Sequence, residues 1–310
     1  LTFNDNYEGR ELTAGDSEMT MDYFNRQDMK MTPPDSLTKK NRREWLQFGF
    51  KPGQIVTPTD NLNSQEVRQW KYQKYIKDYL ATVKSVDDNI GKVLEYLKNN
   101  GLEENTIVIY SSDQGFFLGE HGFFDKRFMY EESLKMPFVI RYPGKIKAGT
   151  VVTDVISNID FAPTLLDMAG VSIPEKVQGN SFFNILKGEN TKDWRQSMYY
   201  HYYEYPYYHR VQPHYGIRNQ RYKLIHFYYD IDAWEFYDLE NDPDEMNNLI
   251  NNHAQASTVN RLKLELYQLK ELYGNTLTIE ELRHISDTDF GGLESNKKEQ
   301  QKELNRKLYN

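Results

Sequence analysis

The sequence predicts an α/β fold followed by a small α+β subdomain with an antiparallel sheet. Between residues 64 and 170, apolar runs of strand length alternate with segments of helical periodicity, which is the pattern of a layered α/β fold. After Gly188 the composition changes, because residues 198–237 hold 12 of the 24 tyrosines. Two segments within this range, residues 217–229 and 235–237, alternate as antiparallel strands do. These two observations divide the chain into an α/β part and a tyrosine-rich part.

The first predicted element is a long helix over residues 64–99. Apolar residues recur there at steps of three and four, which predicts an amphipathic helix packed on a core. Ser64 is the expected N-cap, and Gly101 is expected just past the end of the helix. The preceding residues 1–62 have little apolar periodicity, and we expect a long excursion over a larger body.

Three short runs then predict strands. Residues 106–110 and 137–142 are apolar and rich in β-branched or aromatic side chains. We therefore expect two buried strands, the first of them parallel to its neighbours. Residues 151–156 predict an edge strand, and residues 159–170 predict a helix with Gly170 just past its end.

The tyrosine-rich part is predicted to combine a sheet with one helix. Residues 217–229 and 235–237 alternate as antiparallel strands. Residues 259–272 predict an amphipathic helix. Residues 276–310 are polar and end in a mixed-charge segment, so we expect a surface tail or helix.

Composition excludes several classes of protein. The 310 residues contain no cysteine, which excludes disulfides, thiolate metal sites and a cysteine nucleophile within them. The net charge of −8 does not fit a nucleic-acid-binding surface. No apolar run approaches the roughly 18 residues of a membrane span. The chain starts at Leu1 without a signal-peptide pattern, so we expect processing or a longer parent protein.

Two polar residues follow the predicted strand 106–110 directly. In an open α/β sheet, ligands bind beyond the carboxyl ends of the strands. Asp113 and Gln114 lie at such an end and offer oxygen ligands, which suit a hard cation such as Ca²⁺ or Mg²⁺. Taken alone, the pair has a simpler interpretation, since an aspartate at a strand end is more often a turn former.

The loop that follows is rich in charge. Glu120 and His121 lie between glycines, and Asp125, Lys126 and Arg127 come next. A lysine provides a compact charge for an oxyanion, and an arginine provides a fork for a carboxylate or sulfate. The loop therefore predicts an oxyanion site. The alternative is a solvated, charged loop with a local salt bridge.

The tyrosine-rich part offers a second group of candidates. Residues 199–204 and 209–216 combine tyrosines with His201, His209 and His214. Aromatic rings with polar tips suit the stacking and hydrogen bonding of a sugar. The alternative is ordinary packing of tyrosines within a sheet.

Taken together, these motifs resemble the type I, formylglycine-dependent sulfatases of the alkaline-phosphatase superfamily. Many members carry His or Asn where this chain has Gln114. Residues 3–10, 28–31 and 125–130 are similar to bacterial N-acetylglucosamine-6-sulfatases in particular. The segments that carry the wider resemblance are residues 111–115, 118–122, 130–133, 160–170, 178–181 and 237–245, together with Lys126 and Pro137.

The resemblance implies an alkaline-phosphatase-like mixed sheet sandwiched by helices, of which this chain would hold the C-terminal part. Residues 1–190 would belong to that catalytic domain, with a long insertion over 1–62 and the metal and sulfate loop within 106–142. Residues 191–275 would form the small antiparallel-sheet subdomain, and residues 276–310 a polar tail.

The resemblance also implies a role for each candidate residue. Asp113 and Gln114 match calcium ligands, and Lys126 matches the lysine that contacts the sulfate. Asp125 and Arg127 would bind sugar hydroxyls. His121 would either line the pocket or hold its loop. The remaining substrate candidates are His214, which precedes a strand similar to the pocket-lining return of the family, and then His209.

One departure from the family concerns the nucleophile. Its motif, Cys/Ser-x-Pro-x-Arg, is absent from this sequence, so the formylglycine would lie outside this chain in a missing N-terminal part. The expected activity is hydrolysis of sulfated glycans, with 6-O-sulfated N-acetylglucosamine as the substrate unit. The alternatives are a phosphonate or phosphodiester hydrolase of the same superfamily and a catalytically dead glycan-binding piece. The resemblance also implies a periplasmic, secreted or surface-anchored protein.

Overall fold

The computed structural model describes residues 2–24, 29, 38–42, 63–189, 192–205 and 209–288. The motif positions 28, 30 and 31 and the mixed-charge end 296–310 lie outside the described residues. The helices are η1 (Thr2–Asn4), η2 (Met21–Tyr23), α2 (Ser64–Asn99), η3 (Glu103–Asn105), η4 (Glu120–Gly122), α3 (Glu131–Leu134), η5 (Asn158–Asp160), α4 (Phe161–Met168), α5 (Phe183–Leu186), η6 (His253–Gln255), α6 (Ala256–Leu272) and α7 (Ile279–Thr288). The strands are β1 (Val108–Ser111), β2 (Phe117–Leu118), β3 (Phe124–Asp125), β4 (Phe138–Arg141), β5 (Ser197–Tyr202), β6 (His214–Asn219), β7 (Tyr222–Phe227) and β8 (Ala233–Asp238).

The long helix α2 forms where the apolar periodicity predicts it. Its N-cap is Asn63 rather than Ser64, because the Asn63 side chain accepts from the Glu66 amide while the Glu66 carboxylate accepts from the Asn63 amide. This reciprocal pair is a capping box, which satisfies two backbone donors at once. At the other end Gly101 has a φ of +68°, the left-handed conformation that glycine adopts most readily.

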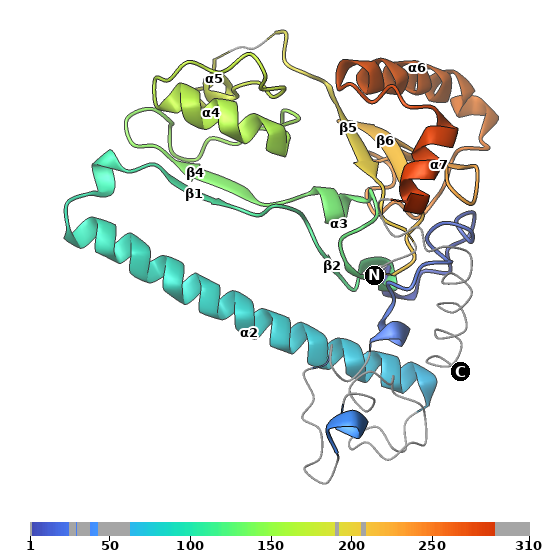
Figure 1. Cartoon of the computed structure of the whole chain (residues 1–310). Helices are drawn as coiled ribbons and strands as arrows, with labels where there is room; N and C mark the ends of the chain where they lie inside the picture. The colour runs from blue at the N-terminus through green and yellow to red at the C-terminus, as the bar shows by residue number, and fades with distance from the viewer. Residues whose placement is uncertain are drawn as a thin grey trace.

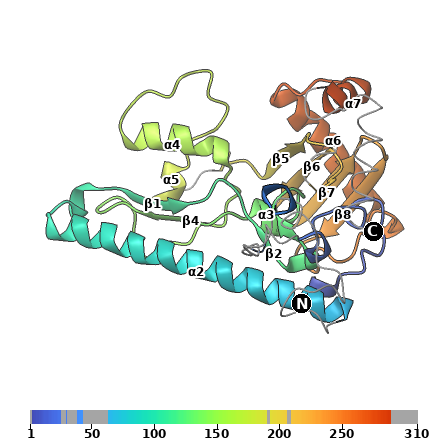
Figure 2. The ribbon, with the colours of Figure 1, turned by 60° about the horizontal axis from the view of Figure 1, so that its bottom comes forward.

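The expectation that α2 is a core helix is wrong for the described residues. Val67 and Lys71 are its buried residues, and they lie in its first two turns. Trp70, Tyr72 and Tyr75 are partly buried beside them. From Leu80 onward the apolar side is largely open, because Leu80, Val83, Val86, Val93 and Leu94 are each at least 43% exposed. Figures 1 and 2 show α2 as a long rod on one side of β1 and β4, with α4 and α5 on the other side.

Strands β1 and β4 pair in antiparallel register, from Val108 opposite Arg141 to Ser111 opposite Phe138. The prediction of a parallel first strand is therefore wrong in the described part of the chain, because the excursion between the two strands returns the backbone in the opposite direction. Their burial is also incomplete, since Val139 is 65% exposed. The predicted edge strand at residues 151–156 is wrong as well, because that segment forms no ladder and Val151 is 85% exposed.

The helix predicted over 159–170 is present as η5 followed by α4, with Gly170 at a φ of +68°. Aromatic and aliphatic residues of β4 pack against this helix and α5. The buried members of this cluster are Met168, Phe182, Ile185, Leu186 and Trp194. The two strands are thus covered on the α4 side and open toward α2 (Figure 2).

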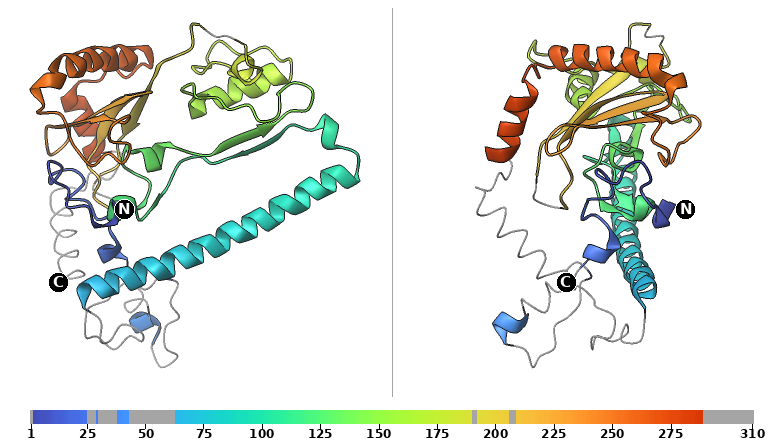
Figure 3. Two further views of the ribbon diagram at one scale, coloured as in Figure 1. Left: turned by 180° about the vertical axis from the view of Figure 1, so that it is seen from behind. Right: turned by 90° about the vertical axis from the view of Figure 1, so that its right-hand side faces the viewer.

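The tyrosine-rich part forms an antiparallel sheet in the order β5-β6-β7-β8, as the alternating pattern predicts. Side chains alternate between its two faces, so neighbouring positions contribute to different cores. Leu224 and Phe236 pack under α6 and α7, together with Val259, Leu262, Leu266 and Leu282. Ile225 and Tyr237 face the opposite side, where they meet the N-terminal residues and the loop after β2. Figure 3 shows α6 across one face of this sheet.

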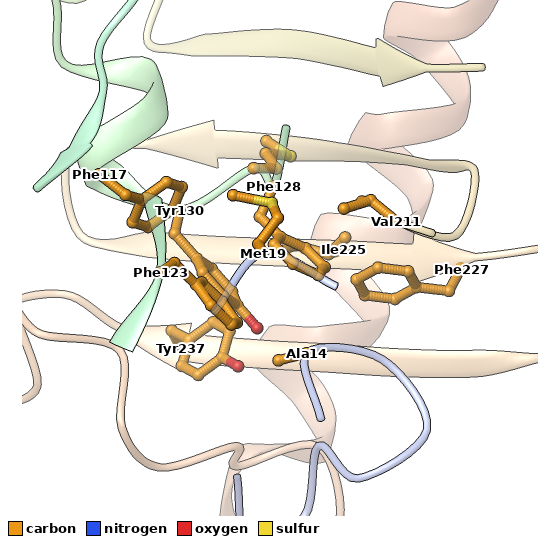
Figure 4. Packing of buried hydrophobic residues seen from close by; sticks show 11 residues of the cluster. Ala14, Met19, Phe117, Phe123, Phe128, Tyr130, Val211, Ile225, Phe227 and Tyr237 are labelled. Carbon is orange, nitrogen blue, oxygen red and sulfur yellow. The ribbon is translucent and has the colours of Figure 1, made fainter. Parts of the chain in front are cut away.

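Residues 2–24 cross the second face of the sheet, and we call them the strap. Ala14 and Met19 of the strap are fully buried between the sheet and the aromatic residues of the loop (Figure 4). The aromatic residues of this core include Phe117, Phe123, Phe128 and Tyr130. The core therefore joins three segments that are distant in the sequence. No helix in the described part of the chain is long and apolar enough to cross a membrane.

Candidate active site

The end of β1 is tied to the loop that carries Lys126. Gly115 permits this close approach, because a Cβ there would lie 2.0 Å from the Glu132 carbonyl oxygen. The Gly115 amide donates to the Ser133 carbonyl at 2.8 Å, and the Ser133 hydroxyl donates to the Lys126 carbonyl at 3.0 Å. Asp113 and Gln114 therefore lie in the same loop assembly as Lys126.

The side-chain oxygens of Asp113 and Gln114 at the end of β1 could provide part of the ligand set for a hard cation. Asp113 is exposed, and one carboxylate oxygen accepts from the Ser112 hydroxyl at 3.3 Å. Ca²⁺ takes six to eight oxygen ligands, whereas this pair offers an aspartate carboxylate and one amide oxygen. Among the described residues, no group of three or more His, Cys, Asp or Glu side chains could hold a metal ion. Any cation here would need further ligands from elsewhere.

Asp125 joins the charged residues of the loop to His209 of the tyrosine-rich part. Its Oδ2 lies 2.5 Å from Arg127 Nη1 and 3.0 Å from His209 Nε2, and its Oδ1 lies 3.7 Å from Lys126 Nζ. Burial opposes the charged form, but the hydrogen bond to His209 and the charge of Arg127 hold the pKa of Asp125 below its usual value. The carboxylate of Asp125 is thus held by Arg127 and the His209 ring, with Lys126 close to its other oxygen.

The end of β5 brings residues of the candidate aromatic segment 199–204 to the charged loop. The Tyr200 hydroxyl donates to the Arg127 carbonyl at 3.2 Å. Glu204 Oε2 lies 3.8 Å from Arg127 Nε and accepts from the Tyr202 hydroxyl at 3.3 Å. Glu204 was visible in the aromatic segment 199–204, but nothing local linked it to a loop nearly 80 positions earlier.

His214 lies beside this group in an aromatic setting. Its side chain is fully buried, and its ring centroid lies 5.6 Å from that of Tyr200 and 5.4 Å from that of Tyr202. Nδ1 donates to the Gln212 carbonyl at 2.7 Å, whereas Nε2 has no partner within the described residues. Burial lowers the pKa of His214 to about 4, so the ring is neutral at pH 7 and Nε2 can accept a hydrogen bond.

His121 is held in the core by the strap. Its ring is fully buried, and Nδ1 lies 2.9 Å from Asp5 Oδ2. The Tyr7 hydroxyl donates to the His121 carbonyl at 2.7 Å. On the other side Nε2 lies 3.9 Å from Glu132 Oε2. The strap thus fixes both the ring and the backbone of His121.

The fold and this loop assembly define a class of protein. Residues 35–171 match the family described as "Sulfatase", and residues 119–272 match "N-sulphoglucosamine sulphohydrolase, C-terminal". The chain belongs to the sulfatase family, with the alkaline-phosphatase-like α/β fold that the resemblance implies. Both the predicted family and the predicted fold class are confirmed.

Two curated relatives are similar to this chain over most of its length. The chain is 46% identical to an N-acetylglucosamine-6-O-sulfatase of Bacteroides thetaiotaomicron over 86% of this chain and 50% of that relative. It is 34% identical to an arylsulfatase of Clostridium perfringens over 63% of this chain and 40% of the relative. The chain therefore spans half or less of these curated relatives.

Two solved structures are also similar to this chain, again over only part of their own length. BT4656 in complex with its substrate D-glucosamine-2-N,6-O-disulfate aligns with a TM-score of 0.81 and 42% identity, over 91% of this chain and 60% of that one. A phosphonate monoester hydrolase from Silicibacter pomeroyi aligns with a TM-score of 0.61 and 26% identity, over 72% of this chain and 45% of that one. Of these two structures, BT4656 resembles this chain more than the phosphonate monoester hydrolase does.

Proposed function

We propose that this chain is part of a sulfatase that hydrolyses the 6-O-sulfate ester of N-acetylglucosamine or glucosamine units in glycans. The observation that carries the proposal is the joined group of Asp125, Lys126, Arg127 and His209 beside the β1 end. It occurs in a chain that is 46% identical to an N-acetylglucosamine-6-O-sulfatase. The substrate of the BT4656 complex, a 6-O-sulfated glucosamine, supports the same substrate class.

In this proposal the residues divide the substrate between them. Lys126, whose side chain is 37% exposed, is available to a sulfate oxygen and to the charge that develops toward the leaving oxygen. Asp125 and Arg127 receive sugar hydroxyls, with His209 holding the carboxylate of Asp125. His214 is fully buried against the rings of Tyr200 and Tyr202, so in this proposal it supports these aromatic residues from within the core rather than binding the sugar directly as the sequence predicted.

In this proposal His121 holds the loop and does not line the substrate pocket. Its ring is buried and bonded to Asp5, and its backbone is bonded to Tyr7. This geometry supports the alternative that His121 holds the loop in place.

In the proposed site, this chain supplies two of the metal ligands. The other ligands and the nucleophile come from outside this chain. Asp113 and Gln114 would hold a calcium ion, or magnesium in its place, by their side-chain oxygens. When bound, such an ion would offset the negative charge of the sulfate, and the formylglycine would supply the nucleophile. We propose that both the nucleophile and the missing ligands belong to an N-terminal portion of the parent protein.

The exposed apolar residues of α2 and β4 support the proposal that a further portion of the parent protein packs against this chain. Exposed residues of α2 and β4, such as Leu80, Val83 and Val139, would need cover in a stable domain. This chain aligns with 50% and 40% of the lengths of the two curated relatives, so their additional residues provide material for that cover. In this proposal residues 1–190 complete a catalytic domain, 191–275 form a subdomain, and 276–310 form a tail. Export to the periplasm or cell surface is part of the same proposal.

The test is sulfate release by the full-length parent protein and by this chain alone. We expect the parent protein to release sulfate from 6-sulfated N-acetylglucosamine and this chain alone to release none. Residues that act together in catalysis lose nearly all activity when the nucleophile is missing, and the formylglycine would lie outside this chain. A phosphonate monoester is the control substrate. Turnover of the phosphonate without turnover of the sulfate would overturn the proposal. Binding of the sugar without any turnover by the parent protein would support a dead glycan-binding protein instead.

A further inference from the structure

Several non-glycine residues with left-handed backbone gather around the proposed sugar site. The φ angles are +53° at His121, +77° at Asp125, +72° at His209 and +49° at Arg210. Side chains other than glycine rarely adopt this region, and they persist there only where the surrounding structure holds them. The contacts that hold His209 and Arg210 therefore matter for the position of the His209 ring.

The strap supplies these contacts to the backbone. The Glu18 amide donates to the His209 carbonyl at 2.6 Å. The Glu18 carbonyl lies 3.2 Å from His209 Nδ1, while Nε2 of the same ring lies 3.0 Å from Asp125 Oδ2. With both ring nitrogens engaged, the orientation of the imidazole is fixed between the strap and the charged loop.

The strap also contacts the segment that carries Asp125, the hydrogen-bond partner of His209. The Phe124 amide donates to the Met19 carbonyl at 2.9 Å, and Thr20 forms a bridge with Phe123. Residues 16–20 therefore lie between the segment that ends in Asp125 and the segment that begins with His209. A shift of these strap residues would move both.

Arg210 connects the second segment to the strap by charge. Its guanidinium lies 3.4 Å from Asp16 Oδ2 and 4.0 Å from Glu18 Oε1. The hydroxyl of Tyr205 bonds to the same guanidinium. Among the described residues, Arg210 pairs with Asp16 and Glu18 of the strap and forms no ion pair with Asp125, Lys126 or Arg127. It therefore has no direct place in the proposed sugar site.

We propose that Arg210 is a positioning residue: together with Asp16 and Glu18 of the strap, it holds His209 in the conformation that places its ring on Asp125. The strap thereby determines how well the site recognises the sugar ring. This inference rests on the proposed function for its kinetic consequence. Its geometric consequence, the position of the His209 ring, does not depend on that function.

The kinetic experiment compares Arg210→Ala with the wild-type parent protein on two substrates. We expect kcat/KM for 6-sulfated N-acetylglucosamine to fall on the order of tenfold to a hundredfold through KM, as for a displaced binding group. Turnover of a small aryl sulfate, which lacks the sugar hydroxyls, should be unchanged. Arg210→Lys should restore most of the loss, and Arg68→Ala is the matched control, because Arg68 pairs with Asp22 of the strap away from His209.

Equal losses on both substrates would show that Arg210 is merely structural, and no loss on the sugar would remove its positioning role. The second measurement is the imidazole NMR signal of His209 in this chain, assigned with His209→Gln. We expect Arg210→Ala, or Asp16→Asn with Glu18→Gln if that variant does not fold, to shift this signal. An unshifted signal would overturn the inference even if the protein is a sulfatase. A wild-type protein inactive on both substrates, with a shifted signal, would remove the proposed function alone.

Discussion

The Tyr130 hydroxyl donates to Glu235 Oε2 at 2.8 Å, which links the loop after Lys126 to strand β8 of the second sheet. The Tyr237 hydroxyl donates to the same oxygen at 2.8 Å, and the Thr13 hydroxyl of the strap donates to Oε1. One buried carboxylate thus accepts from the loop, the strap and the sheet. Burial raises the pKa of Glu235, as expected for a carboxyl group without water around it.

Glu235→Ala should therefore destabilise the chain by about 2–3 kcal/mol, because three buried hydroxyls lose their acceptor. The measurement is the free energy of unfolding in urea. Glu240→Ala is the control, since its side chain is 66% exposed and pairs with Arg221 at the surface. A loss no larger than that of the control would show that the hydroxyls find other acceptors.

Stability should also depend on pH through Glu245. Burial raises the pKa of Glu245 to about 7, even though Lys223 Nζ lies 2.7 Å away. Between the ordinary value of 4.5 and about 7, the folded chain holds a proton that the unfolded chain has released. Stability should therefore fall as the pH rises through this window, on the order of 1–3 kcal/mol.

Glu245→Gln keeps the shape of the side chain but cannot ionise, so it should flatten this pH dependence. The measurement is urea unfolding at intervals from pH 4.5 to 8, with Glu240→Gln as the exposed control. A fall of the same size in wild type and Glu245→Gln would assign the dependence to other groups.

The proposed metal ligands make a direct prediction. Asp113→Ala in the parent protein should weaken calcium binding and lower sulfate release together, because one carboxylate ligand is lost. Calorimetric titration with Ca²⁺ measures the first effect and sulfate release the second. A structure of the parent protein with calcium, in which Asp113 and Gln114 both lie more than about 4 Å from the ion, would contradict the assignment.

Lys126 should act mainly on kcat. Lys126→Ala in the parent protein should lower kcat on the order of 10²-fold or more, as for removal of an oxyanion donor. Lys135→Ala is the control, because Lys135 is exposed and follows the same loop. Full turnover by Lys126→Ala would show that Lys126 is only a surface lysine.

Asp125 should act on sugar recognition instead. Asp125→Ala should lower kcat/KM for the sugar sulfate by about tenfold to a hundredfold, since hydrogen bonds to hydroxyls are lost. Desulfation of a small aryl sulfate should change far less. A similar loss on both substrates would mean that Asp125 does not bind the sugar.

The sequence predicted the elements whose periodicity is local. Helix α2, the helix before Gly170 and the antiparallel strands β6 to β8 all follow from the spacing of apolar residues. The direction of β1 did not follow, because apolar composition is the same in a parallel and an antiparallel buried strand. Exposure of α2 did not follow either, since a periodic stripe does not say which residues will cover it.

The site shows the same division. The charged loop with Asp125, Lys126 and Arg127 was visible as a sequence motif. Its contact with His209 spans 84 positions and depends on a left-handed backbone at both residues, which no local pattern of non-glycine residues predicts. The contribution of Glu18 was hidden for the same reason, because its backbone contacts with His209 leave no mark in the sequence.

The two faces of the antiparallel sheet have different consequences for sequence divergence. Positions such as Leu224 and Phe236 pack in the core beneath α6 and α7, on the face away from the charged loop, so exchange among aliphatic and aromatic residues there should mainly alter stability. Positions such as Ile225 and Tyr237 share a core with the strap and the charged loop. Drift on that face also moves the segments that flank Asp125 and His209. Adjacent residues of one strand are thus under separate constraints: changes on one face affect mainly stability, whereas changes on the other also affect the positions of Asp125 and His209.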